Sequence, residues 1–175
     1  KDLKRNKAVG VDGVSVEEYG TSLQSNVSKL IDSMKSKSWR PQPVRRVYIP
    51  KPGKSEKRPL GIPATEDKLV QMAVKKILES IFEGEFLDCS HGFRPSRSCH
   101  TAIKGLNACM MKRPVNFIVE VDIRRFFDNV SHYWLQRCLE EKISDPNMIW
   151  IIRKLLKAGV MIDGVWDATS VGTPQ

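Results

Sequence analysis

Apolar residues recur at helical spacing along much of the chain. From Leu23 to Met34 they follow one another at intervals of three and four residues, and Ser15 with Glu18 forms a capping box ahead of them. Such spacing gathers apolar side chains on one face of a helix, so the pattern predicts a helix over roughly residues 16–37.

Four further helices are predicted from the same spacing and from their start signals. Thr65 precedes a broad apolar face that we expect to lie in the core, and Ser98 and Ser131 each stand before another apolar series. Asp145 is followed by Pro146, which suits the first position of a helix because proline lacks the amide hydrogen that is unpaired there.

Between the first two helices the period changes from helical to extended. Val44–Ile49 is rich in β-branched residues, Pro50–Lys54 is turn-rich, and Arg58–Ile62 can return as a second strand. We therefore predict a β-hairpin over residues 44–62.

Two later runs also have strand character. Phe117–Asp122 is the most strand-like run in the chain, and Met161–Val165 is a short one. Short strands that alternate with helices predict an α+β fold.

The net positive charge of the chain indicates a class of binding partner. The chain of 175 residues carries a net charge of +9, and residues 35–58 hold nine basic residues with Glu56 as the only acid. A local excess of this kind attracts a polyanion such as nucleic acid. A solvated basic face remains the alternative. The basic residues are Lys35, Lys37, Arg40, Arg45, Arg46, Lys51, Lys54, Lys57 and Arg58.

The cysteine spacing and the hydropathy argue against a zinc site and a membrane-spanning segment. The four cysteines form no CxxC pair, which argues against a compact zinc site and favours reduced thiols in the cytoplasm. No apolar run approaches the roughly 20 residues of a membrane span, so no membrane partner is expected. The chain starts at Lys1 rather than methionine, and we expect it to be an excerpt of a longer protein.

Asp122 is the first candidate for chemistry because it ends an apolar strand. A buried carboxylate is costly unless a cation or hydrogen-bond donors compensate it. Magnesium prefers oxygen ligands and commonly takes only one or two protein carboxylates. A helix cap, or an ion pair with Arg124 or Arg125, would also explain the residue.

An ordered set of motifs resembles the group II intron reverse transcriptases (maturases) of bacteria. The set comprises Lys7–Gly13, Ile49–Gly53, Arg58–Pro63, His91–Pro95, Val121–Asp122 with Phe126-Phe127-Asp128, and Gly172–Gln175. The resemblance covers nearly the whole chain. It implies the fingers of a right-hand polymerase plus part of a ferredoxin-like palm, with an N-terminal extension and fingers helix over 1–40, fingers over 41–115 and the first part of the palm over 116–175.

The implied reaction is RNA-directed DNA synthesis. A primer 3′-hydroxyl attacks the α-phosphate of a deoxynucleotide, assisted by two Mg²⁺ ions. The resemblance makes Asp122 the catalytic metal ligand and gives the Ile123 carbonyl a place in the metal shell. The family's paired aspartates are absent from the chain, so we expect these 175 residues alone to be inactive.

The resemblance also assigns the nucleotide and template contacts. Arg58, Lys51 and Arg45 would reach the triphosphate, and the physics of fixed positive charge agrees. Phe127, or else Phe126, would be the ring that excludes a 2′-hydroxyl, the other ring being core, and Asp128 would be structural. Gln175 would line the nucleotide pocket, while Arg94, Arg97, Arg46 and Lys54 would contact template RNA.

The implied partners are intron RNA, an RNA template with a DNA primer, and deoxynucleotides. A splicing factor that binds intron RNA without catalysis is the second hypothesis, and another class of bacterial reverse transcriptase is a third. The expected setting is the bacterial cytoplasm, in association with nucleic acid. The oligomeric state stays open, a homodimer included.

Overall fold

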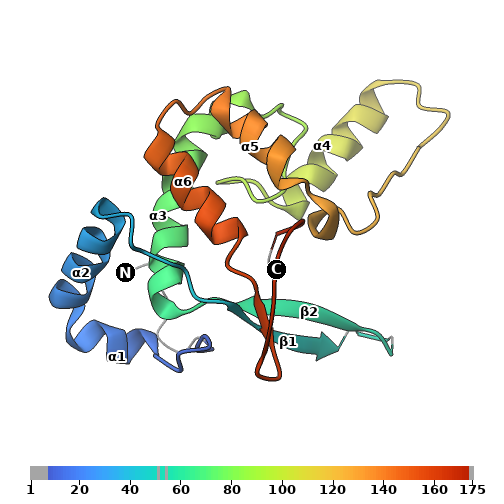
Figure 1. Cartoon of the computed structure of the whole chain (residues 1–175). Coiled ribbons are helices and arrows are strands. Elements are labelled where there is room, and N and C mark those ends of the chain that lie inside the picture. Colours follow the sequence, from blue (N-terminus) through green and yellow to red (C-terminus); the bar gives the residue numbers. More distant parts are fainter. Residues whose placement is uncertain (1–7, 51, 54, 174–175) are drawn as a thin grey trace. The chain divides into compact units, whose positions relative to one another are not determined.

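The computed structural model describes residues 8–50, 52–53 and 55–173 (Figure 1). Lys51, Lys54 and Gln175, three predicted site residues, lie outside this range. The chain divides into two compact units, and each is described by itself. The first unit comprises residues 1–74 and 125–175, and the second unit comprises residues 75–124.

The first unit contains a four-stranded sheet in the order β2-β1-β3-β4. β1 (Val44–Pro50) pairs antiparallel with β2 (Lys57–Ile62), which confirms the predicted hairpin. β1 also pairs in parallel with β3 (Val160–Ile162), which itself pairs antiparallel with β4 (Val165–Asp167). Together with the helices, this mixed sheet confirms the α+β class.

The predicted strand 161–165 is instead a second hairpin. The chain turns at Asp163 and Gly164, both with positive φ (47° and 82°). Two such residues in succession suit the tight turns whose twist matches that of antiparallel strands. An Asp-Gly pair is a strong signal for this turn, and it explains why the run continues to Asp167.

Most helix starts agree with their predicted caps. The side chains of Ser15, Ser98, Ser131 and Asp145 each accept a hydrogen bond from a backbone amide of the first turn. They open α1 (Val16–Thr21), α4 (Cys99–Lys112), α5 (His132–Glu140) and α6 (Pro146–Leu156). Short polar side chains at these positions satisfy amides that have no partner within the helix.

Two helix predictions need correction. The single helix expected over 16–37 is two helices, α1 and α2 (Leu23–Lys35), which break at Ser22. Thr65 does not cap α3 (Thr65–Phe82) but is its first residue, and its hydroxyl donates to the carbonyl of Val14 at 2.7 Å. Thr65 is buried, so this bond gives its hydroxyl the partner that burial requires.

The hydrophobic core lies in the first unit. It is formed by one end of the hairpin, the first half of α3, α6 and β3, together with residues of α1, α2 and α5. Its members include Trp39, Val44, Ile62, Val70, Val74, Ile149, Ile152 and Val160. None of the described residues of the second unit is buried, so that unit has no core of its own.

A buried polar cluster lies at the start of α3. The Asp67 carboxylate accepts a hydrogen bond from the Gln42 amide at 2.8 Å, and the Tyr19 hydroxyl donates to Glu66 at 3.0 Å. Burial raises the pKa of Asp67 to about 6, with help from the nearby charge of Glu66, and raises the pKa of Tyr19 to about 12. The cluster joins three segments that are distant in sequence.

The predicted strand at 117–122 is wrong for this structure. Residues 114–123 form no regular element and pair with none of the four strands. Phe117 is 87% exposed and Val121 82% exposed. A strand requires a neighbour for its backbone hydrogen bonds, and the described residues supply none here. No helix among the described residues is long and apolar enough to cross a membrane.

Candidate nucleotide and nucleic-acid interface

The basic hairpin (residues 44–62) grades from a buried base to an exposed tip. Val44 and Ile62 are buried at the base, whereas Ile49 and its register partner Arg58 lie exposed near the tip. Arg58 forms no hydrogen bond or ion pair with any residue that the structure describes. Its guanidinium therefore has all its donors available for a ligand.

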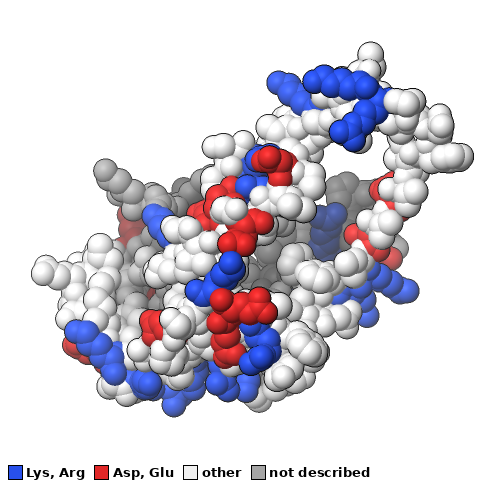
Figure 2. Space-filling view, turned by 90° about the horizontal axis from the view of Figure 1, so that it is seen from above, with Lys and Arg blue, Asp and Glu red and all other residues white. Residues whose placement is uncertain are grey.

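The excess of positive charge is concentrated in one stretch of the sequence. The face of the molecule in Figure 2 carries acidic as well as basic side chains. Residues 35–58, by contrast, hold nine cations and one acid. The basic hairpin contributes most of that excess. The positive charge therefore lies on an element whose tip is exposed.

Arg45 has a structural partner at the base of the hairpin. Its Nε and one terminal nitrogen donate to the carbonyl of Val9 at 3.0 and 2.8 Å. Gly10 packs so closely on Ala64 that a Cβ at Gly10 would lie 2.5 Å from the Ala64 Cα. These contacts fix residues 8–14 against the hairpin base, and the triphosphate contact of Arg45 stays a prediction.

Arg46 lines a cavity of about 200 Å³ together with Asp128 and the segment 167–173. Its Nε is buried and has no hydrogen-bond partner among the described residues. An unpartnered buried donor carries a desolvation cost, which a bound water or an anion would relieve. Arg46 therefore faces a cavity beside Asp128, and its contact with template RNA stays a prediction.

The motif at Phe126-Phe127-Asp128 and the motif at Gly172-Thr173 lie side by side. The amide of Thr173 donates to the Phe127 carbonyl at 2.9 Å, and the amide of Gly172 donates to the Val130 carbonyl at 2.8 Å. Gly172 has a φ of 78°, and a Cβ there would lie 2.6 Å from the Asp128 carbonyl oxygen. The two motifs are thus joined by a contact that only glycine allows.

His132 adds a contact to this junction that was not predicted from the sequence. Its Nε2 donates to the carbonyl of Gly172 at 2.6 Å, which fixes the tautomer that carries the proton on Nε2. The histidine stands one residue after the Ser131 cap, so nothing in its sequence context indicated a partner forty residues away.

Both phenylalanines are accessible. Phe126 is 53% exposed and Phe127 is 44% exposed, and their rings pack edge to face with centroids 5.6 Å apart. The expectation that one of them is a core residue is therefore wrong for this structure. The choice between them as the ring against the sugar stays a prediction.

Asp122 and Ile123 are exposed and belong to the second unit. The Asp122 carboxylate makes no hydrogen bond or ion pair with any described residue. Arg125, one of its alternative partners, lies 3.6 Å from Asp128 instead. Among the described residues, no group of three or more His, Cys, Asp or Glu side chains is placed to hold a metal ion.

Arg94 organises the loop before α4. Its Nε and one terminal nitrogen bind Glu83 at 3.0 and 2.8 Å, and its other terminal nitrogen donates to the carbonyls of Leu87 and Ser90. The side chain is only 7% exposed. Template contact by Arg94 stays a prediction, and it would require these bonds to be exchanged.

Arg97 makes a looser contact in the same loop. It donates to the carbonyl and the carboxylate of Asp88 at 2.8 and 3.0 Å. The Asp88 carboxylate is fully exposed, so a phosphate can compete for the guanidinium. Of the two arginines, Arg97 is the more available for template RNA.

Comparison with known proteins gives the family. The reverse transcriptase (RNA-dependent DNA polymerase) family matches residues 49–175. The chain is 43% identical to the group II intron-encoded protein LtrA of Lactococcus lactis subsp. cremoris. The match covers the whole chain and 29% of that protein. It is 39% identical to protein YkfC of Escherichia coli, over 95% of the chain and 44% of that protein.

A plant relative is named as an intron maturase. Over 54% of the chain, the sequence is 30% identical to nuclear intron maturase 1 of Arabidopsis thaliana, of which it covers 13%. The chain thus spans less than half the length of each of these relatives. It belongs to the reverse transcriptase (RNA-dependent DNA polymerase) family, and its sequence groups it with the proteins encoded by group II introns.

Proposed function

We propose that the protein containing this chain is the RNA-directed DNA polymerase of a group II intron. The first 115 residues would form the N-terminal extension and fingers of a right-hand polymerase, and residues 116–175 would begin its palm. Its substrates would be deoxynucleotides and a DNA primer on an RNA template, in the bacterial cytoplasm. Family membership supports the reaction class, and the free Arg58 at the hairpin tip is the observation that carries the nucleotide site.

The argument for Arg58 rests on charge and availability. A triphosphate carries several negative charges and is bound best by fixed cations, and a guanidinium can hold two phosphate oxygens at once. Arg45 is bonded to Val9 in residues 8–14 (the lead-in segment), whereas Arg58 has no partner among the described residues. Arg58 is therefore an exposed hairpin arginine with donors free for the β- and γ-phosphates, whereas the unpartnered Nε of Arg46 is buried.

Asp122 and the Ile123 carbonyl are the proposed Mg²⁺ ligands. Both are exposed, and the Asp122 carboxylate is not committed to another described group, so its oxygens fit the hard donors that Mg²⁺ prefers. Bound Mg²⁺ would lower the pKa of the attacking hydroxyl and offset charge on the leaving pyrophosphate. One carboxylate is not a complete site, and we expect no extension by the 175-residue chain alone.

Phe127 is proposed as the ring that faces the sugar. Its backbone carbonyl is held by Thr173, so the residue has a fixed position next to the motif that would continue to Gln175. A ring in van der Waals contact with the sugar excludes a 2′-hydroxyl by steric overlap. Phe126, whose ring packs on Phe127, is the alternative.

The test is the Arg58→Gln variant of the full-length protein in primer extension on an RNA template. We expect the KM for deoxynucleotides to rise about tenfold or more, which corresponds to loss of one charge-assisted contact of about 1.5–3 kcal/mol. The matched control is Arg113→Gln, which removes an exposed arginine at the end of α4. RNA affinity should be equal in both variants.

The second candidate function is intron RNA binding that promotes splicing without catalysis. The relative named as a maturase favours it. The same pair of variants separates the two functions. If Arg58→Gln weakens RNA binding and leaves the KM for deoxynucleotides unchanged, the triphosphate assignment is wrong and the maturase reading is favoured.

A further inference from the structure

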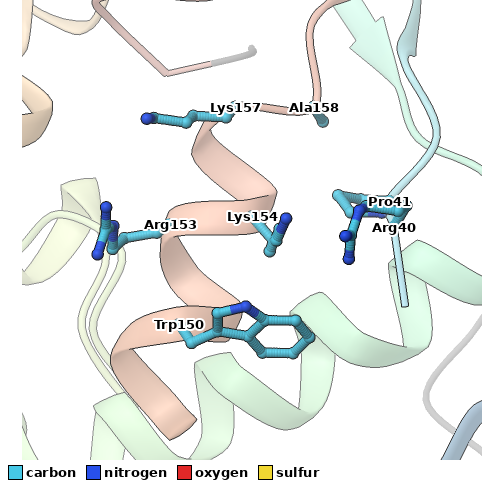
Figure 3. Close-up of a pocket in the computed structure, with 7 residues that line it drawn as sticks. All are labelled: Arg40, Pro41, Trp150, Arg153, Lys154, Lys157 and Ala158. Carbon is cyan, nitrogen blue, oxygen red and sulfur yellow. The ribbon is translucent and has the colours of Figure 1, made fainter. Parts of the chain in front are cut away.

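A cationic pocket lies in the first unit, on a different element from the basic hairpin. It has a volume of about 350 Å³ and is lined by the last turns of α6 and by the segment after α2 (Figure 3). This volume is within the roughly 300–1,000 Å³ of ordinary ligand sites. Its lining residues are Arg40, Pro41, Trp150, Arg153, Lys154, Lys157 and Ala158.

The pocket is built on one stripe of α6. Arg153 and Lys154 follow Trp150 by three and four residues, and Lys157, the C-cap, follows them by four and three. Residues at these intervals are neighbours on a helix surface. Arg40 reaches the same pocket from another segment, and one of its terminal nitrogens is fixed by the carbonyls of Lys37 and Trp39. Four cations and one indole thus line one pocket. In Figure 3, Lys154 and Trp150 lie toward Arg40, whereas Arg153 and Lys157 extend to the other side of α6.

No carboxylate lines the pocket. None of its four cations forms an ion pair with an acid in the part of the chain that the structure describes. Cations in the last turn of a helix do stabilise the negative end of its dipole, which would explain the α6 residues alone. That explanation does not account for Arg40, which belongs to no helix, or for the hollow between the two segments.

Trp150 is positioned as a platform. Its ring packs edge to face on the buried Trp39, with centroids 6.2 Å apart, and this contact holds the indole in place. Lys154 Nζ lies 5.9 Å from the centroid of the Trp150 ring. This is the outer limit of a cation–π contact, so an arriving base can displace the lysine toward a phosphate.

We propose that this pocket binds a single-stranded segment of nucleic acid, with a base stacked on Trp150 and the flanking phosphates on Lys154, Lys157, Arg153 and Arg40. An aromatic surface bordered by cations is the chemistry that sequence-independent single-strand binding uses. An acidic peptide would engage the cations but would leave the indole unused. The site goes beyond the proposed polymerase function, because none of its residues belongs to the hairpin or to the metal ligands.

The first test is photocrosslinking to the unaltered chain. A single-stranded RNA of about 12 nucleotides, within the usual single-strand site sizes, carries 5-iodouridine, which crosslinks to a stacked aromatic ring. Trypsin cleavage after Lys142 and Arg153 gives the peptide 143–153, which contains Trp150 as its only aromatic residue. We expect the RNA adduct on this peptide by mass spectrometry. The same oligonucleotide as DNA tests whether the 2′-hydroxyl matters.

The second test compares two double variants with the same charge change. Lys154→Gln with Lys157→Gln removes two cations from the pocket, and Lys104→Gln with Lys112→Gln removes two exposed lysines from α4. Removing two phosphate contacts should lower the slope of log K against log salt by about 1.4 and weaken binding about tenfold at low salt. The α4 variant should change both quantities far less.

Either of two results overturns the proposal. One is an RNA adduct that maps to other peptides and not to 143–153. The other is an equal loss of affinity in the two double variants, which would show attraction by net charge alone. Competition by polyglutamate as strong as that of the oligonucleotide, at equal charge, would likewise overturn it in favour of an acidic protein partner.

Discussion

The buried carboxylate of Asp67 gives a prediction in which two opposing effects can be weighed. Asp67 is 3% exposed and lies in the first turn of α3. Burial disfavours its charged form, while the Gln42 amide and the positive end of the helix dipole favour it. Burial is the larger effect, so the pKa of Asp67 rises from 3.8 to about 6.

The direction of the pH dependence follows from this shift. The native state holds a proton on Asp67 at pH values at which the unfolded chain has released it. The stabilisation is therefore fully present below about pH 4 and is lost as the pH rises through 6. A shift of about two pKa units corresponds to roughly 2–3 kcal/mol in the free energy of unfolding.

The Asp67→Asn variant isolates this contribution. The asparagine oxygen can still accept the Gln42 hydrogen bond, but the side chain no longer ionises. Denaturant titrations followed by tryptophan fluorescence give the free energy of unfolding of each protein between pH 4 and 7. We expect the difference, wild type minus variant, to fall by about 2–3 kcal/mol over this range. The control is Asp32→Asn, which removes an exposed carboxylate from α2.

A flat difference for Asp67→Asn would refute the reasoning, since it would mean that the native pKa equals the unfolded one. A difference that rises with pH would refute it more strongly. It would show that the hydrogen bond and the helix dipole outweigh burial at this site.

Two further predictions concern contacts that join sequence motifs. Gly172→Ala should destabilise the first unit by about 1–3 kcal/mol in denaturant titration, because the added Cβ meets the Asp128 carbonyl and φ is positive, whereas Gly84→Ala, with open space around it, should not. Arg94→Lys loses the two-nitrogen contact with Glu83 and should speed amide exchange in residues 86–98, while Arg97→Lys, whose acid is exposed, should leave exchange nearly unchanged. Equal exchange in the two lysine variants would contradict the structural role given to Arg94.

The elements that depend on local chemistry could be predicted from the sequence. Four polar caps and the hairpin at 44–62 were found because each is specified within a few residues. The apolar period runs through Ser22, so it does not indicate the break between α1 and α2. The composition of residues 161–165 is that of a strand, but the Asp163-Gly164 pair within it specifies the turn of the second hairpin.

Elements that depend on distant partners could not be predicted. The run 117–122 has the composition of a strand, but composition does not supply the neighbour that a strand must pair with. The same holds for the candidate site. Nothing near Arg45 in the sequence indicates that it donates to the Val9 carbonyl, and nothing near Arg94 indicates that it binds Glu83.

The arginines of the candidate site differ in how many of their N–H donors are already bonded to other residues of the protein. Arg94 is almost enclosed and Arg45 holds the lead-in segment, so replacing either changes the structure before it changes any ligand contact. Arg97 shares its guanidinium with an exposed acid, and Arg58 has no described partner. A loss of activity in an Arg45 or Arg94 variant would therefore not identify a ligand contact, because the loop or lead-in would be lost with it. Arg58 is the position at which an unchanged fold and a changed KM can be observed together.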